Sequence, residues 1–433
     1  MRACKYRIYP NEEQKQLFAE HFGHTRYVYN WALNIKQETY KDKQISVTKR
    51  EIQDLLVASK KQAKPWLNEV NSQSLLFSLD CVDKAYNRFF KKQNAFPRFK
   101  NKYAKQSFSC PQHSRVDRKK QLLTLPKIKD IKIKLHRELP ENFKTVTISK
   151  TPTGKYFASF VIEETIINKV KDKQILVNID DILGIDLGIS DFAITSTNQK
   201  IANLRLLDKS LPKLAKWQKI NARQKYKLEE IIIKKSDTEI KKNKKIYSKN
   251  KEKSKLNIAR MHEKIANQRN DYLHKVSHSI VSKSQATYIA IEDLNVKGMI
   301  RNKKLARHIA NAAWYKFTTM LSYKAEWNNK RVLQIDRFAP SSKTCSCCGH
   351  KLEKLPLSIR KWECPHCHTR HDRDINAAKN IAKFAQIKLA DGLGHSLAVK
   401  SSSTSKLISV SEVAKGMHKY FAYGSQETPP IVF

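Results

Sequence analysis

Two Cys-x2-Cys pairs constrain this chain more than any other feature of its sequence. Cys345 and Cys348 form the first pair, and Cys364 and Cys367 form the second pair after fifteen intervening residues. Each pair can offer two thiolates to one ion, and the intervening segment allows the pairs to complete a tetrahedron, as in structural zinc sites. We therefore predict that these four cysteines hold one Zn²⁺ that maintains shape, because four protein ligands leave no open position for chemistry.

The same segment contains other possible zinc ligands. They are Cys347, His350, His366 and His368. Gly349 directly after the second thiolate favours Cys345 and Cys348 as the ligands of the first pair. Of the eight cysteines, five fall between Cys345 and Cys367 and three are scattered. Clustered cysteines in a large chain indicate a reduced, intracellular protein with a metal site.

Charge gives the second constraint. The 433 residues include 84 Lys and Arg against 40 Asp and Glu, a net charge of +44. This excess indicates a polyanionic partner, with nucleic acid the first choice and an anionic membrane surface the second. Since no run of about 18 uncharged apolar residues occurs, we expect no membrane-spanning segment. We expect a cytoplasmic, nucleoid-associated protein.

The spacing of apolar residues predicts the order of elements. Residues 2–9 predict a short strand, and Pro10 and Asn11 predict a helix start that leads into helical spacing up to about residue 92. Alternation between about 106 and 165 predicts a small β-barrel or sheet. A strand, turn and strand follow from Ile182.

The second half of the chain begins with a basic insert. We predict a long helical insert over 212–283. Its residues 213–275 include 20 basic and 7 acidic side chains. A solvated helix face explains such a charge run as well as nucleic-acid binding does. Two further strands, at 287–291 and 331–335, flank a helix, and a last helix begins near Asp372.

Three groups of acidic residues stand out. Asp186 lies between Gly184 and Gly188 in a chain with only ten glycines, and strand alternation places all three on one face. This predicts a lone carboxylate on a bare surface that is open to a hydrated metal and a phosphate. A strand-end acid on an exposed face is the alternative.

Glu292 ends an apolar strand, and Asp372 and Asp374 enter the last helix. One acid suffices to cap a helix, which leaves the other for a different role. Three acids on separate elements are what a two-metal nuclease requires, with Mg²⁺ preferred because it shares oxygen ligands with phosphate.

Seven motifs occur in an order that is highly specific. They span residues 6–10, 23–30, 96–100, 184–188, 291–299, 340–349 and 371–378. In these motifs the chain closely resembles the TnpB family, the RNA-guided nucleases that bacterial and archaeal insertion sequences encode and that are related to miniature type V CRISPR effectors. The resemblance extends from about residue 2 to 385. The chain departs from it at Asn329 and His368, where the family commonly has Gly, and at Cys347.

The resemblance implies an α+β multidomain fold: a helical recognition lobe, a β-barrel wedge domain, and an RNase H-like (RuvC) nuclease domain with an inserted zinc finger. The expected divisions are wedge strand 1–10, recognition lobe 11–105, wedge barrel 106–178, nuclease 179–342 with basic insert 212–283, target-binding zinc finger 343–369, last nuclease helix 370–388 and a disordered tail 389–433.

The resemblance also implies the site residues. It assigns Asp186, Glu292 and Asp374 as the catalytic triad that holds Mg²⁺ or Mn²⁺, and it selects Asp374 over Asp372. We expect further nucleic-acid contacts at Asn71, Ser72, Gln73, Ser74, Arg98, Lys100, Arg301 and Arg373.

The implied activity is cleavage of DNA next to a short target-adjacent motif, directed by a guide RNA from the transposon end. The implied partners are that guide RNA and a DNA target, both double-stranded and single-stranded. Protein and guide RNA would form a monomeric ribonucleoprotein. The alternatives are a nuclease-inactive RNA-guided repressor and a transposase or transposase-accessory protein. A CRISPR effector would differ mainly in having a repeat array near its gene.

Overall fold

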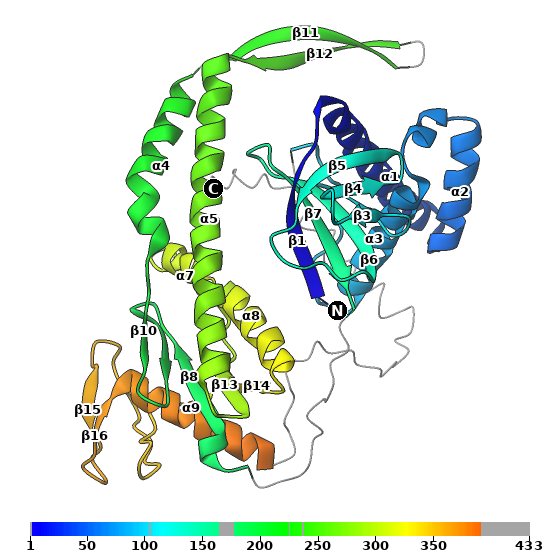
Figure 1. Cartoon of the computed structure of the whole chain (residues 1–433). Coiled ribbons are helices and arrows are strands. Elements are labelled where there is room, and N and C mark those ends of the chain that lie inside the picture. Colours follow the sequence, from blue (N-terminus) through cyan, green and yellow to red (C-terminus); the bar gives the residue numbers. More distant parts are fainter. Residues whose placement is uncertain (1, 104, 164–176, 225, 236–237, 391–433) are drawn as a thin grey trace. The chain divides into compact units, whose positions relative to one another are not determined.

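The computed structural model describes residues 2–103, 105–163, 177–224, 226–235 and 238–390. Figure 1 shows the elements of the chain in sequence colours. By its internal contacts, the chain divides into two compact units. Unit 1 comprises Met1–Lys169 and Arg205–Tyr272, and unit 2 comprises Val170–Leu204 and Leu273–Phe433. The expected tail at 389–433 lies, from residue 391 onward, outside the described residues.

Unit 1 is built on a seven-stranded antiparallel sheet. Its spatial order is β2 (Gln106–Cys110), β6 (Phe143–Lys150), β7 (Tyr156–Ile162), β1 (Arg2–Tyr9), β5 (Ile128–Lys134), β4 (Leu122–Leu125) and β3 (Arg115–Asp117). The alternating side chains Tyr6 and Ile8 are fully buried on one face of β1, where Phe18 and Phe22 of the first helix cover them.

The prediction of a barrel is wrong in one respect, because this sheet stays open. Its edge strands, β2 and β3, are not paired with each other. A barrel closes only when strand number, tilt and stagger agree. Here β3 has only three residues, and the first helix fills the concave apolar face that closure would otherwise enclose.

The helices of unit 1 form a second core. Helix α1 (Glu12–Lys43) begins at Asn11, whose side chain and that of Gln14 form a capping box, and this confirms the predicted start. Helices α2 (Lys49–Lys61) and α3 (Ser72–Phe90) and the 3-10 turn Pro65–Glu69 follow. Apolar side chains spaced three and four residues apart pack between them. The fully buried ones include Val28, Leu33, Ile52, Leu67 and Leu75.

The basic insert is not helical throughout, so that prediction is wrong. Helices α4 (Leu206–Arg223) and α5 (Lys249–Lys283) are joined by an antiparallel hairpin of β11 (Tyr226–Lys235) and β12 (Thr238–Tyr247). The sequence contains three consecutive β-branched residues, 231–233, whose restricted side-chain torsions favour a strand over a helix.

Unit 2 contains a five-stranded mixed sheet. Its order is β10 (Lys200–Ala202), β9 (Asp191–Thr195), β8 (Ile182–Leu187), β13 (Tyr288–Glu292) and β14 (Arg331–Ile335). Strands β8, β13 and β14 run parallel, and β9 runs antiparallel to β8. The carboxyl ends of β8 and β13 therefore lie at one edge of the sheet.

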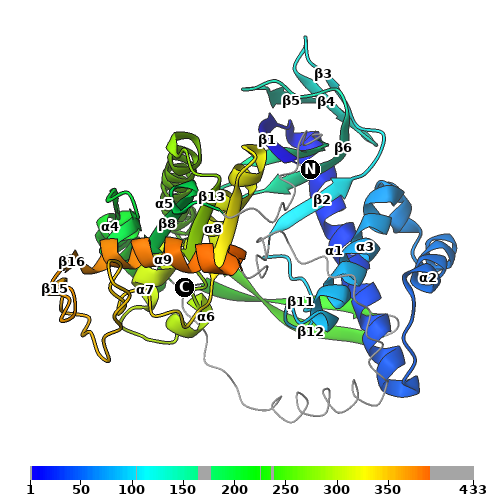
Figure 2. The same ribbon diagram turned by 90° about the horizontal axis from the view of Figure 1, so that it is seen from below.

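Helices cover this sheet. The last helix, α9 (Arg373–Ala390), crosses it, as Figure 2 shows, and packs Ile381 and Ala382 against Ile182 of β8. Helix α8 (Trp314–Trp327) is joined to β9 by an edge-to-face contact of Phe317 with Phe192, whose ring centroids lie 4.9 Å apart. The short helices α6 (Val296–Met299) and α7 (Ala306–Ala312) precede α8.

Gly184 corrects the expectation of a bare surface around Asp186. A Cβ atom at Gly184 would lie 2.0 Å from the backbone oxygen of Ala378 in α9. The glycine thus allows the helix to pack directly on the strand, and the face that carries Asp186 is covered over part of its length. Gly188 serves the tight turn into β9, since a Cβ atom there would lie 2.7 Å from the Asp191 oxygen.

None of the described helices combines the length and the apolar character that crossing a membrane demands.

Candidate functional site

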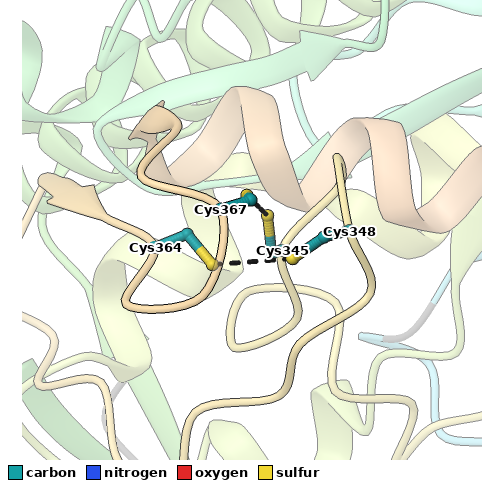
Figure 3. Close-up of side chains that lie close together, drawn as sticks. All are labelled: Cys345, Cys348, Cys364 and Cys367. Atoms are coloured by element: carbon teal, nitrogen blue, oxygen red, sulfur yellow. Dashed lines mark hydrogen bonds between the residues drawn. The ribbon is translucent and has the colours of Figure 1, made fainter.

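The structure brings the four predicted cysteines together in unit 2 (Figure 3). All four Sγ atoms lie within 4.8 Å of one another. Residues 345–350 and 364–369 form two matching knuckles. In each, the first cysteine receives a hydrogen bond at its carbonyl from the residue four positions later and donates its N–H to the carbonyl five positions later. These local hydrogen bonds give both knuckles the same backbone shape.

The fourth residue after each first cysteine adopts a left-handed conformation. Gly349 has φ +79° and His368 has φ +56°. Only glycine adopts this region without strain, so His368 is less favourable at its position than the glycine that the family commonly has.

The alternative ligands lie outside the cluster. Cys347 is exposed and donates its N–H to Cys345 Sγ over 3.4 Å. Thr369 holds the pKa of the Cys367 thiol down at about 5, through its hydroxyl first and its N–H second. A thiolate is the form that binds a metal, so this contact favours the metal-ligating state.

Sequence reasoning missed His371. Its Nε2 atom lies 3.0 Å from Cys345 Sγ, and its ring packs 4.7 Å from that of Trp362. The two residues face each other across the hairpin of β15 (Lys361–Glu363) and β16 (Arg370–Asp372). The available signal was the position of His371 immediately before the acidic pair.

Two of the three predicted acids lie on neighbouring strands. Ile185 pairs with Ile291 in the parallel register of β8 and β13, so Asp186 and Glu292 each follow at the carboxyl end. Burial, followed by the negative charges of Glu292 and Asp374, raises the pKa of Asp186 to about 7. Burial also raises the pKa of Glu292, and a hydrogen bond from Ser341 opposes that shift.

The acids at the start of α9 have separate partners. Asp372 accepts hydrogen bonds from the N–H groups of Asp374 and Ile375, so it caps the helix, and it pairs with Lys200 over 2.6 Å. Although burial acts in the opposite direction, these contacts hold the pKa of Asp372 below its usual value. Asp374 lies in the first turn and pairs with Arg360 over 3.2 Å.

The three carboxylates are close enough to interact electrostatically but do not form a compact ligand cluster. Among the described residues, the four cysteines are the only set of three or more metal-ligating side chains whose ligand atoms all lie within 4.8 Å. Arg360 at Asp374 and Ser341 at Glu292 occupy part of the carboxylate oxygens.

The expected nucleic-acid contacts fall into two groups. Asn71 and Ser74 are buried at the start of α3, where Asn71 accepts the N–H of Gln73 and donates to Ser74. Ser72 accepts a hydrogen bond from Lys60. At this position the structure shows helix capping, and it leaves Ser72 and Gln73 as the accessible side chains.

The expected basic residues differ in a similar way. Arg98 and Arg301 are exposed. The Lys100 ammonium lies 3.7 Å from the centre of the Tyr29 ring, and Arg373 donates to the carbonyl of Pro356 over 3.1 Å. These last two cations already have partners within the fold.

Three family models match the chain. A Cas12f1-like TNB domain matches residues 314–381, a helix-turn-helix domain matches 1–44, and a probable transposase matches 165–303. A Streptomyces pristinaespiralis protein named "Putative RNA-guided DNA endonuclease" is 34% identical over 398 residues, which cover 90% of this chain and 92% of the relative. The Escherichia coli K12 protein "Putative RNA-guided DNA endonuclease InsQ" is 30% identical over 90% of this chain and 94% of its own.

This chain belongs to the TnpB family. A further member, the "TnpB-like protein L79" of Acanthamoeba polyphaga mimivirus, is 31% identical over 55% of this chain and 43% of its own. Among solved structures, CasPhi-2 (Cas12j) bound to crRNA and phosphorothioate DNA aligns over 90% of this chain and 91% of its own, with 11% identity and a TM-score of 0.41.

Proposed function

We propose that this TnpB-family chain is an RNA-guided DNA endonuclease. It would use a guide RNA from its transposon end and cut DNA beside a short target-adjacent motif. The observation that carries the proposal is the placement of Asp186 and Glu292 at adjacent strand ends, with Asp374 in the first turn of the helix that packs on them. The near full-length similarity to proteins named as RNA-guided DNA endonucleases supports it.

The finer assignments follow from the same arrangement. The five-stranded sheet of unit 2, with β9 antiparallel and β8, β13 and β14 parallel, fits an RNase H-like (RuvC) nuclease domain. In unit 1, helices α1, α2 and α3 would form the recognition lobe, and the open sheet would serve as the wedge that grips the guide.

The four cysteines fit Zn²⁺, because four sulfur ligands within 4.8 Å match its tetrahedral preference. The three acids fit Mg²⁺ or Mn²⁺ through their chemistry: Asp186 is buried, and the negative charges of Glu292 and Asp374 raise its pKa further, so a cation is needed for it to stay ionised beside them. When bound, divalent ions supply an activated water and stabilise the leaving oxygen. The residues Asp186, Glu292 and Asp374 hold and orient that centre.

Affinity for guide and target would come from lysine and arginine contacts with phosphates, in keeping with the net charge of +44. Sequence selection would come from base pairing between guide and DNA, in a monomeric ribonucleoprotein that acts at the nucleoid.

The test is to express the chain with its native flanking DNA and sequence the RNA that copurifies. Replacing only the guide segment should redirect cleavage to the new matching DNA. Cleavage at one fixed DNA site with every guide would instead indicate a transposase. Tight guided binding without any cutting by the wild type, in the presence of Mg²⁺, would indicate a repressor.

A further inference from the structure

Ser341 contacts one of the proposed catalytic acids. Its hydroxyl donates a hydrogen bond of 2.5 Å to Oε1 of Glu292, and the serine itself is only 4% exposed. The two residues are 49 positions apart in the chain. A carboxylate offers several lone pairs on two oxygens, so this single donor fixes the orientation of the group and leaves Oε2 for a cation.

The backbone around Ser341 is fastened to α9 by two buried asparagines. The amide of Asn380 donates to the carbonyls of Ser341, over 2.8 Å, and Thr344, over 2.5 Å. The amide of Asn376, one turn earlier, donates to Thr344 and accepts from the N–H of Ser346, each over 2.8 Å. Both asparagines are at most 2% exposed.

These contacts join the elements that carry two of the acids, Glu292 and Asp374. Helix α9 carries Asp374 in its first turn, and the same helix holds the segment 341–346 whose first residue orients Glu292. A buried amide without a partner lowers the stability of the fold. Here the side-chain amides of Asn376 and Asn380 find their partners in this one segment. The segment also contains Cys345, the first of the proposed zinc ligands.

We propose that Ser341 is a positioning residue for the metal-binding carboxylate of Glu292, and that Asn376 and Asn380 set its place relative to Asp374. This inference rests on the proposed nuclease function. If Ser341 only fills space in the local packing, a side chain of similar shape can replace it. If Ser341 positions Glu292, the replacement must keep the hydroxyl.

The decisive comparison is between Ser341→Thr and Ser341→Val, because these side chains share a shape and differ in the hydroxyl. Ser341→Ala gives a smaller side chain, and Ser342→Ala is the matched control at a half-exposed neighbour. Each variant is prepared as the full-length ribonucleoprotein. Zinc content, guided target binding, Mn²⁺ binding by electron paramagnetic resonance, and single-turnover cleavage against Mg²⁺ concentration are then measured.

We expect Ser341→Ala and Ser341→Val to keep zinc and target binding and to need roughly 10- to 100-fold more divalent metal, the usual effect of removing a group that orients a metal ligand. Ser341→Thr should lie close to wild type, and Ser342→Ala should match it. Equal metal dependence of the Thr and Val variants would overturn the proposal, as would a Ser341→Ala protein with wild-type metal dependence. Loss of zinc in the Val variant but not in the Thr variant would also overturn it, because the hydroxyl would then serve the finger.

The Mn²⁺ measurement separates this proposal from the proposed function. If the wild type binds Mn²⁺ at Glu292, shown by loss of that binding in Glu292→Gln, but cuts no guided target, the nuclease assignment fails while the role of Ser341 is still decided by the Thr and Val variants.

Discussion

The four-cysteine cluster and the three acids lie in the same unit, but they are organised in opposite ways. The four sulfur atoms lie within 4.8 Å of one another, and each knuckle closes its own backbone hydrogen bonds over six residues. The three acids come from two strands and a helix, and Arg360 and Ser341 occupy some of their oxygens. The difference teaches that local backbone structure shapes each half of the sulfur cluster, whereas each carboxylate depends on tertiary packing for its neighbours.

The largest expected effect concerns the four-cysteine cluster. Cys364→Ser should remove zinc and unfold the segment 345–371, because zinc binding of this kind contributes about 10–16 kcal/mol to local folding. Metal analysis and limited proteolysis would measure this. Cys347→Ser is the control, since that thiol is exposed and outside the cluster. Equal zinc loss in both variants would contradict the ligand assignment.

Among the three acids, Asp374→Asn should lower the rate of cleavage by roughly a thousandfold or more. The reason is that a metal ion held by a carboxylate stabilises the transition state by several kcal/mol. Guided binding should be unchanged or slightly stronger, since one negative charge is lost. Asp372→Asn is the control: asparagine also caps helices, so most activity should remain. Single-turnover cleavage at equal protein and guide concentrations compares them. Full cutting by Asp374→Asn would end the triad assignment.

A smaller effect should appear in stability against pH. The pKa of Asp186 is raised from 3.8 to about 7 in the folded protein, by burial first and by Glu292 and Asp374 next. Between about pH 4 and 7 the folded state therefore holds a proton that the unfolded state has released, so the contribution of this group to stability falls as pH rises through that window.

Asp186→Asn removes that penalty. In chelator, we expect its melting temperature to exceed that of wild type by roughly 2–6 °C at pH 8, with little difference at pH 4. Asp181→Asn, at an exposed carboxylate just before β8, should show no such pH-dependent gain. A lower melting temperature for Asp186→Asn at pH 8 would contradict the raised pKa of Asp186.

The smallest effect concerns the backbone of the second knuckle. His368→Gly should relieve the left-handed strain and tighten zinc binding by at most about 1 kcal/mol, since added flexibility of the unfolded chain offsets part of the gain. Gly349→Ala, at the equivalent position of the first knuckle, should weaken binding by about 1 kcal/mol. Chelator competition measures both. Weaker binding by His368→Gly would indicate a role for the imidazole itself.

The sequence by itself determined the features that depend on short stretches of chain. The spacing of Cys345, Cys348, Cys364 and Cys367 identified the sulfur cluster, and the capping residue Asn11 located the start of α1. Strand patterns also placed Asp186 on a strand and Glu292 at a strand end. Each of these depends on hydrogen bonds or side-chain periodicity within a few residues, which the sequence specifies directly.

Tertiary structure alone decided the remaining features. Alternation in β8 suggested an open face at Gly184, but the approach of α9 covers it. The seven-stranded sheet of unit 1 stays open because a helix fills its concave face. The contacts of Ser341 with Glu292 and Asn380 join residues that are 49 and 39 positions apart in the chain. Such contacts depend on how separately specified elements pack. Many sequences share the same local patterns, and only the packed arrangement selects which side chains meet.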